Sequence, residues 1–187
     1  MTARDRLVDS TRELLWERGY VGTSPRAVLE ASGVGQGSLY HHFRGKADLA
    51  LAAIERTADE LTARAEEFLG RPGPAVERVE AWLDRERDVL RGCPIGRLTS
   101  DPDVVADERM RAPVARTLAA VQARIAQVLA EGTRSGELPA DLDSDAVAAT
   151  LLATLQGGYV LARAAGSPEP YHRAVRGAVD LLRRAAR

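Results

Sequence analysis

Apolar residues recur at intervals of three or four along most of the chain, and no stretch alternates apolar with polar residues as a half-buried strand would. The spacing predicts helices over about 7–18, 25–32, 36–43, 46–69, 76–90, 113–135, 146–165 and 171–185. Proline and glycine interrupt the pattern at 70–74, and they exclude a single long helix over 92–103. We therefore predict an all-α protein.

Two short helices joined by a glycine-containing turn occupy residues 23–46. Ser24 is a favourable N-cap for the first helix, and Pro25 suits its first position, where a missing N–H does no harm. Gly33 tolerates positive φ and is expected to end that helix. A short helix held by its neighbour across such a turn is typical of helix-turn-helix DNA-binding proteins.

The second of these helices separates a core-facing edge from a polar face. Leu39 and Phe43 lie four residues apart and should point into the core, with Val34 buried in the turn. The other faces carry small, polar and aromatic residues: Gln36, Gly37, Ser38, Tyr40, His41 and His42. Because glutamine can pair with adenine and hydroxyl or imidazole groups can donate to phosphate, this face suits a DNA duplex.

The N-terminal helices resemble those of the TetR family of transcriptional repressors. The family's recognition helix and the helix after it are similar to GVGQGSLYHHFRGKADLALAAI, and the helix before them is similar to RDRLVDSTRELLWERGYVGTS. Farther on, a TetR subgroup with a GCxxG segment and a glycine-rich late helix resembles RGCPIGRLTSD and LLATLQGGYVLARA. The resemblance implies a three-helix helix-turn-helix domain over 1–46 and a helical effector-binding and dimerisation domain over 47–187.

The resemblance also implies which residues touch DNA. The polar face of the second short helix would enter the groove, and Thr23 and Arg26 would touch phosphate at the start of the preceding helix. Pro25 departs from the family's pattern by removing an N–H that could contribute there. Lys46 would touch phosphate from the next helix, and it is the only lysine among 26 basic residues.

The function implied by the resemblance is ligand-controlled repression. A homodimer would bind a pseudo-palindromic double-stranded operator and be released by a small-molecule effector. The same residues would also suit a transcriptional activator. A helical ligand- or partner-binding protein that no longer reads DNA is the alternative from another class, and the intact segment 40–46 argues against it.

The distribution of charge supports DNA binding better than the net charge of −1 does. Residues 18–46 hold Arg18, Arg26, Arg44 and Lys46 against Glu30, a formal charge of +3 that leaves −4 for the rest. A basic head on an acidic body suits a protein that docks one end on DNA.

Two further features bear on the location and the chemistry of the protein. The single cysteine excludes an intramolecular disulfide, and with no signal peptide it predicts a cytoplasmic protein. The glycines of 33–37 have the wrong spacing for a dinucleotide loop, and the adjacent His41 and His42 would diverge on a helix instead of sharing a metal. We therefore expect no enzyme, no metal and no cofactor.

The helix over 146–165 is apolar nearly all round, so it should be buried on more than one side. Its length would suit a membrane span, but its alanine-rich composition with Gln156 and Arg163 favours packing against its own domain and a second subunit. Together with the last helix it would form a four-helix dimer interface, as in the family that the chain resembles. The expected interface residues are Leu152, Gln156, Tyr159, Val160, Tyr171, Val175, Ala178 and Leu182.

Large or polar side chains in the C-terminal part are the candidates for an effector site. They are Phe68, Trp82, Cys93, Arg97, Met110, Gln156 and Tyr159, and core packing is the competing interpretation for each. Arg97 could bind an anionic ligand, whereas walls rich in alanine and leucine suggest a largely apolar one. A small buried thiol suits Cys93 better than a redox sensor, because no second cysteine could resolve it.

Overall fold

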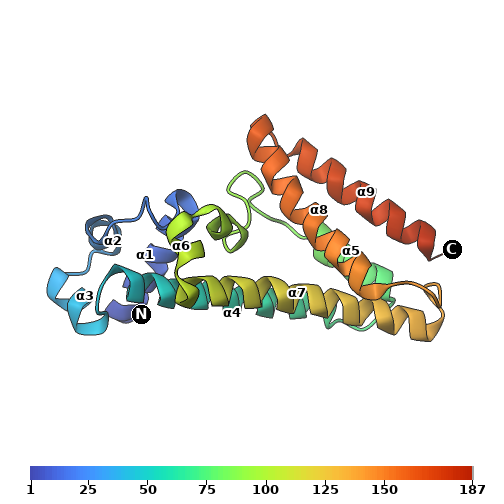
Figure 1. The fold of residues 1–187 in the computed structure, drawn as a ribbon, viewed down its shortest axis with the longest axis horizontal. Coiled ribbons are helices and arrows are strands. Elements are labelled where there is room, and N and C mark those ends of the chain that lie inside the picture. Colours follow the sequence, from blue (N-terminus) through green and yellow to red (C-terminus); the bar gives the residue numbers. More distant parts are fainter. Residues whose placement is uncertain (187) are drawn as a thin grey trace. The chain divides into compact units, whose positions relative to one another are not determined.

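The computed structural model describes residues 1–186, and every regular element within them is helical, as the sequence predicts (Figure 1). In chain order the elements are α1 (Ala3–Arg18), α2 (Pro25–Ser32), α3 (Gln36–His42), α4 (Lys46–Leu69), α5 (Ala75–Asp84), the 3₁₀ turn η1 (Gly96–Ser100), α6 (Pro102–Ala106), α7 (Glu108–Ser135), α8 (Ser144–Ala165) and α9 (Glu169–Ala185).

The helices are grouped into two compact units. The first consists of Met1–Glu60 and Cys93–Thr117, and the second of Leu61–Gly92 and Leu118–Arg187. The segment from η1 to the start of α7 therefore packs with the N-terminal helices, far away in the sequence. The predicted domain boundary after residue 46 separates the DNA-binding part from the effector-binding part and does not coincide with these compact units. It stays a prediction.

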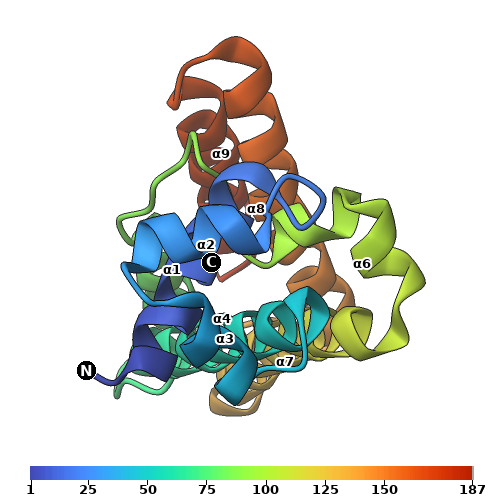
Figure 2. The same cartoon turned by 90° about the vertical axis from the view of Figure 1, so that its left-hand side faces the viewer.

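Helix α1 begins at Ala3, before the predicted residue 7, whereas α2 begins and ends where its capping residues predict. Thr2 and Asp5 form a reciprocal capping box at the start of α1. The Ser24 hydroxyl accepts a hydrogen bond from the Ala27 N–H at 3.1 Å, and Gly33 ends α2 at φ 62°. Figure 2 shows α2 and α3 beside α1, so the three helices form one small layered unit.

Aliphatic side chains from α1 to α4 form the core of the first unit. Leu7, Val28, Leu39, Leu49 and Ile54 are each at most 2% exposed. Burying a leucine or isoleucine of this kind contributes roughly 1.5–3 kcal/mol, which explains why such short helices hold a fixed arrangement.

Two helix boundaries differ most from the sequence prediction. The helix expected over 76–90 ends at Asp84, and Leu90 is 45% exposed. The helix expected to begin at Pro113 begins one turn earlier, because the Asp107 carboxylate accepts a hydrogen bond from the Arg109 N–H at 2.9 Å and Pro113 lies inside the helix. An N-cap aspartate outweighed the preference of proline for a first position.

Helices α8 and α9 lie side by side in the second unit (Figure 1). A Cβ added to Gly158 would lie 3.0 Å from Cδ2 of Tyr171, so the glycine allows this close approach. The core face of α9 consists of Tyr171, Val175, Val179 and Leu182, whereas Leu181 is 70% exposed. Within the described residues, α8 alone has the length and hydropathy of a membrane span, a criterion that core helices of soluble proteins also meet.

Candidate nucleic-acid interface and effector cavity

Helix α3 is anchored on one side and open to solvent on the other. Leu39 and Phe43 are 1% and 4% exposed, and Val34 is buried in the turn before the helix, as predicted. The open side, called the recognition face below, consists of Gln36, Gly37, Ser38, Tyr40, His41 and His42. Ser38 is half-buried and the others are exposed. Burial of one edge thus fixes the orientation of a polar surface.

The recognition face combines hydrogen-bonding groups with space for a close approach. Tyr40 is 57% exposed, and the rings of His41 and His42 meet edge to face with centroids 4.9 Å apart. Apart from its chain neighbours and the backbone of α3, no described residue has a heavy atom within 4 Å of a Cβ built on Gly37, so a ligand backbone can come close there. These are the groups that contact phosphates and base edges in protein–DNA complexes.

Two basic residues flank the recognition face. The Arg26 side chain is 87% exposed and its Nε donates to Glu30 at 2.8 Å, a surface pair of small energetic value. The Lys46 ammonium lies 4.1 Å from the centroid of the Tyr20 ring, a cation–π contact that orients this lysine. The phosphate contacts expected of both residues stay predictions.

The phosphate contact expected of Thr23 does not suit this structure. Thr23 is 2% exposed, and its hydroxyl donates to the Gly19 carbonyl at 2.7 Å. Its backbone N–H donates to the Tyr20 carbonyl at 3.1 Å. Both donors are satisfied inside the chain, so Thr23 shapes the entry to α2 and has no donor left for DNA in this conformation.

One residue that the sequence analysis missed connects the two segments of the first unit. The Asp101 carboxylate is buried, and its Oδ2 accepts hydrogen bonds from the N–H groups of Tyr20 and Val21 at 2.7 and 3.0 Å. Its Oδ1 caps α6 by accepting from the Asp103 N–H at 3.2 Å. The sequence signal was the aspartate before Pro102, which predicts an N-cap but not the long-range bonds.

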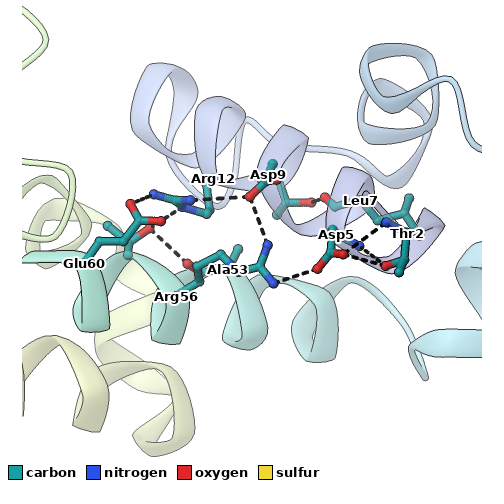
Figure 3. A network of polar contacts seen from close by, with 10 residues as sticks. Thr2, Asp5, Leu7, Asp9, Arg12, Ala53, Arg56 and Glu60 are labelled. Carbon is teal, nitrogen blue, oxygen red and sulfur yellow. Dashed lines mark hydrogen bonds and ion pairs between the residues drawn. The ribbon is translucent and has the colours of Figure 1, made fainter.

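An ion-pair network joins α1 to the middle of α4 (Figure 3). The Arg56 guanidinium pairs with Asp5 at 2.9 Å and with Asp9 at 3.1 Å, and Arg12 pairs with Glu60. Hydrogen bonds from Thr2, and then from Arg56, hold the pKa of Asp5 well below its usual range. The network fixes α4 against the helix that supports α2 and α3.

The residues expected at a dimer interface are mostly buried within one chain. Leu152, Tyr159, Tyr171, Val175 and Leu182 are each at most 8% exposed, so in the single chain they lie in the core and not on the outer surface. Of the others, Val160 is 68% exposed and Gln156 and Ala178 are half-buried. The outer stripe of these helices, called the exposed stripe below, instead consists of Ala146, Thr150, Ala153, Gly157, Val160, Leu161, Gly177 and Leu181.

The candidate effector residues are divided between the two units. Cys93, Arg97 and Met110 belong to the first, and Phe68, Trp82, Gln156 and Tyr159 to the second. Met110, Trp82 and Tyr159 are at most 7% exposed, which agrees with core packing. Cys93 is half-buried, and its sulfur accepts a hydrogen bond from the Gly96 N–H at 3.2 Å.

The second unit has a cavity of about 610 Å³ that is open to solvent. It is lined by Arg64, Phe68, Arg85, Glu86, Arg87 and Asp88, and of these the sequence predicted only Phe68. The sequence analysis missed Arg85 and Arg87 because it continued the fifth helix through them, where they would have formed a solvated face. The volume lies within the range of small-molecule sites, roughly 300–1,000 Å³.

The two half-buried arginines of this cavity have different surroundings. Arg87 donates to the carbonyls of Leu83 and Trp82, at 2.6 and 2.5 Å, and so caps the C-terminus of α5. The Nε of Arg85 is enclosed and has no hydrogen-bond acceptor among the described residues. Burial, and then the charge of Arg87, lowers the pKa of Arg85 to about 10.

Family models match most of the chain. Residues 7–53 match a family of bacterial regulatory proteins, the tetR family, and residues 74–178 match a tetracyclin repressor-like C-terminal domain. The first match covers α1 to the start of α4, which includes the whole recognition face.

Individual proteins are similar to this chain over nearly its full length. The transcriptional regulator AcuR of Cereibacter sphaeroides is 32% identical over 91% of this chain and 80% of its own. The transcriptional repressor DhaR of a Mycobacterium species is 25% identical over 89% of this chain and 85% of its own. The crystal structure of a regulatory protein TetR from Rhodobacter sphaeroides superposes with a TM-score of 0.84 at 29% identity, over 95% of this chain and 97% of that one.

Proposed function

We propose, from the fact that this chain belongs to the TetR family of bacterial transcriptional regulators, that it represses transcription as a homodimer on a pseudo-palindromic operator. A small-molecule effector, bound by the second unit, would release it from DNA. The observation that carries this proposal is the recognition face, which is open to solvent while Leu39 and Phe43 anchor the same helix in the core. Regulators of this family are not enzymes, and we assign no catalytic residue.

In this proposal α3 lies in the major groove. Gln36 and Ser38 would contact base edges, and Tyr40, His41 and His42 would donate to phosphate oxygens. Arg26 and Lys46 would bind phosphates on either side. The Tyr20 ring would hold the Lys46 ammonium in position, which supports the placement of this residue.

The exposed stripe would form the dimer surface. Its alanines and glycines allow helices to approach closely, and Val160, Leu161 and Leu181 would lose the exposure that each has in the single chain. A two-fold dimer requires both α3 helices to reach major grooves about 34–36 Å apart, or somewhat more, which explains the expected operator symmetry.

The effector would act through helices shared by both units. Residues of α4 and α7 belong to the first unit at one end and to the second at the other. A ligand that prefers the released conformation tenfold supplies about 1.4 kcal/mol toward it. Asp101 would transmit that change, because its carboxylate holds the loop before α2 to the start of α6.

Two finer assignments accompany this function. We place the protein in the cytoplasm, where its DNA target lies, and in the TetR subgroup with a GCxxG segment, which here is Gly92–Gly96. Both rest on sequence features.

Fluorescence anisotropy with the DNA upstream of the chain's own gene tests the proposal. We expect tight binding that falls steeply with salt, compared with weak binding to a scrambled duplex. If the operator lies elsewhere in the genome, selection of bound sequences from random duplexes would identify it. If neither experiment yields a selective site, the alternative of a partner-binding protein is favoured, whereas in vitro transcription separates a repressor from an activator.

A further inference from the structure

The cavity of the second unit contains a positive charge, on Arg85, that no carboxylate of residues 1–186 compensates. Half-buried arginines elsewhere pair with carboxylates: Arg12 with Glu60, Arg56 with Asp5, Arg78 with Glu131 and Arg124 with Glu66. Arg85 is also half-buried, but its Nε is enclosed without a hydrogen-bond acceptor, and no carboxylate among the described residues pairs with it. A buried charge is costly unless it is paired, so the position of Arg85 favours an anionic partner in the cavity.

The other two arginines that line the cavity add positive charge beside Arg85. The Arg87 guanidinium donates hydrogen bonds to carbonyl groups at the end of α5. It still carries a full positive charge, and it lines the same cavity. Arg64 also lines the cavity, and it pairs with Glu67 at 3.0 Å. The acidic lining residues, Glu86 and Asp88, are both exposed, and neither pairs with Arg85. Three arginines against two carboxylates leave the lining with one excess positive charge.

The cavity also has one aromatic surface. Phe68 is half-buried, and the Arg71 guanidinium covers its ring at 4.3 Å from the centroid. The same ring lines the cavity. A ligand there would meet a guanidinium and an aromatic ring, a combination that suits a charged group attached to an apolar body.

We propose that this cavity binds a small organic anion with a single acidic group, which pairs with Arg85 while its apolar body lies on Phe68. The single excess charge of the lining favours one acidic group over several. This inference rests on the proposed function, since it names the chemical class of the effector. The sequence suggested Arg97, in the first unit, as the partner of an anionic ligand. In this proposal the partner is Arg85, in the second unit.

The ligand-free protein gives a first test that needs no knowledge of the effector. Arg85→Gln removes an unpaired, partly buried charge beside Arg87 and leaves a shorter, neutral amide in its place. We expect the melting temperature to rise by about 2–4 °C. Arg116→Gln makes the same charge change at an exposed position of α7 and should leave it unchanged. A fall in the melting temperature of Arg85→Gln alone would show that Arg85 is a structural residue and would overturn the proposal.

Calorimetry with matched probes gives the second test. Benzoate should bind, while benzamide and benzylammonium, of similar shape but without negative charge, should not. Phenyl phosphate and inorganic phosphate distinguish a site for a single acidic group from a general phosphate site. Arg85→Gln should lose about 10- to 100-fold in benzoate affinity, and Arg116→Gln should lose none.

Three results would contradict the proposal: benzoate binding that survives Arg85→Gln, equal binding of benzamide, or no binding of any anionic probe. Inorganic phosphate binding as tightly as benzoate would also overturn it, because the aromatic contact would then contribute nothing. Neither test involves DNA, so failure of operator binding would leave both results intact and would count against the proposed function alone.

Discussion

Asp101 accepts a hydrogen bond from the backbone N–H of Tyr20 at 2.7 Å, across 81 positions of sequence. The same carboxylate oxygen accepts from Val21, and the other oxygen caps α6. One buried side chain thus joins the loop that leads into α2 with a segment that follows α5 in the sequence. Tyr20 in turn lies under the Lys46 ammonium, so the contact reaches the start of α4 as well.

Replacing Asp101 tests this link. Asp101→Asn should destabilise the protein by about 1–3 kcal/mol, because an amide has only one accepting oxygen for donors on two sides. The measurement is the denaturant midpoint, together with operator affinity. Asp103→Asn removes the same charge from an exposed residue of the same turn and should cost much less. Equal effects of the two changes would show that the hydrogen bonds to Tyr20 and Val21 contribute nothing.

Acid should weaken the attachment of α1 to α4. The pKa of Asp5 is depressed by Thr2 and Arg56, so its ionised form is stabilised in the folded state. The contribution is fully present above the ordinary value of 3.8 and is lost as the pH falls below it toward the depressed value. Unfolding midpoints of wild type and Asp5→Asn should therefore differ at pH 7 and converge in strong acid. A constant difference across that range would contradict the network.

The glycine between α2 and α3 should be needed for its backbone angle. Gly33 has φ 62°, whereas Gly35, two residues later, has φ −69°. A Cβ at either position would meet no atom within 4 Å, so only the backbone distinguishes them. Gly33→Ala should cost about 1–2 kcal/mol of unfolding free energy, and Gly35→Ala should cost little. Similar costs at the two positions would argue against a strained turn.

The exposed stripe should separate dimerisation from folding. Leu161→Glu and Leu181→Glu place charges at positions that are 55% and 70% exposed in one chain, so the helices should still form. The dimer should weaken by at least about 100-fold, since each charge would be buried twice in a two-fold interface. Light scattering would then give a mass near the 20.1 kDa of one chain. Val105→Glu, on α6, is the control, and a dimer that survives both changes would place the interface elsewhere.

Local sequence signals determined the N-terminal helices better than the rest of the fold. Ser24, Gly33 and the Leu39–Phe43 spacing act within a few residues, so α2 and α3 could be predicted to their ends. The bonds of Asp101 and the buried hydroxyl of Thr23 depend on segments that the fold brings together, and no local pattern encodes them.

Patterns of apolar residues have a further limit, which the C-terminal helices illustrate. Periodicity on α8 and α9 showed that a face is covered, but not whether the same chain or a partner covers it. Tyr171 and Val175 were assigned to the partner, and they pack within their own chain. The cavity arginines were missed for a related reason, because a helix that ends at Asp84 instead of Leu90 changes which residues are enclosed.

The most direct test of the central claim is operator binding by Tyr40→Ala. Tyr40 belongs to the exposed recognition face and contributes nothing to the core, so the dimer mass and the melting temperature should match wild type. Operator affinity should fall by about tenfold or more, and Tyr40→Phe, which loses only the hydroxyl, should fall less. An unchanged affinity of Tyr40→Ala for the operator would contradict the assignment of α3 as the element that reads DNA.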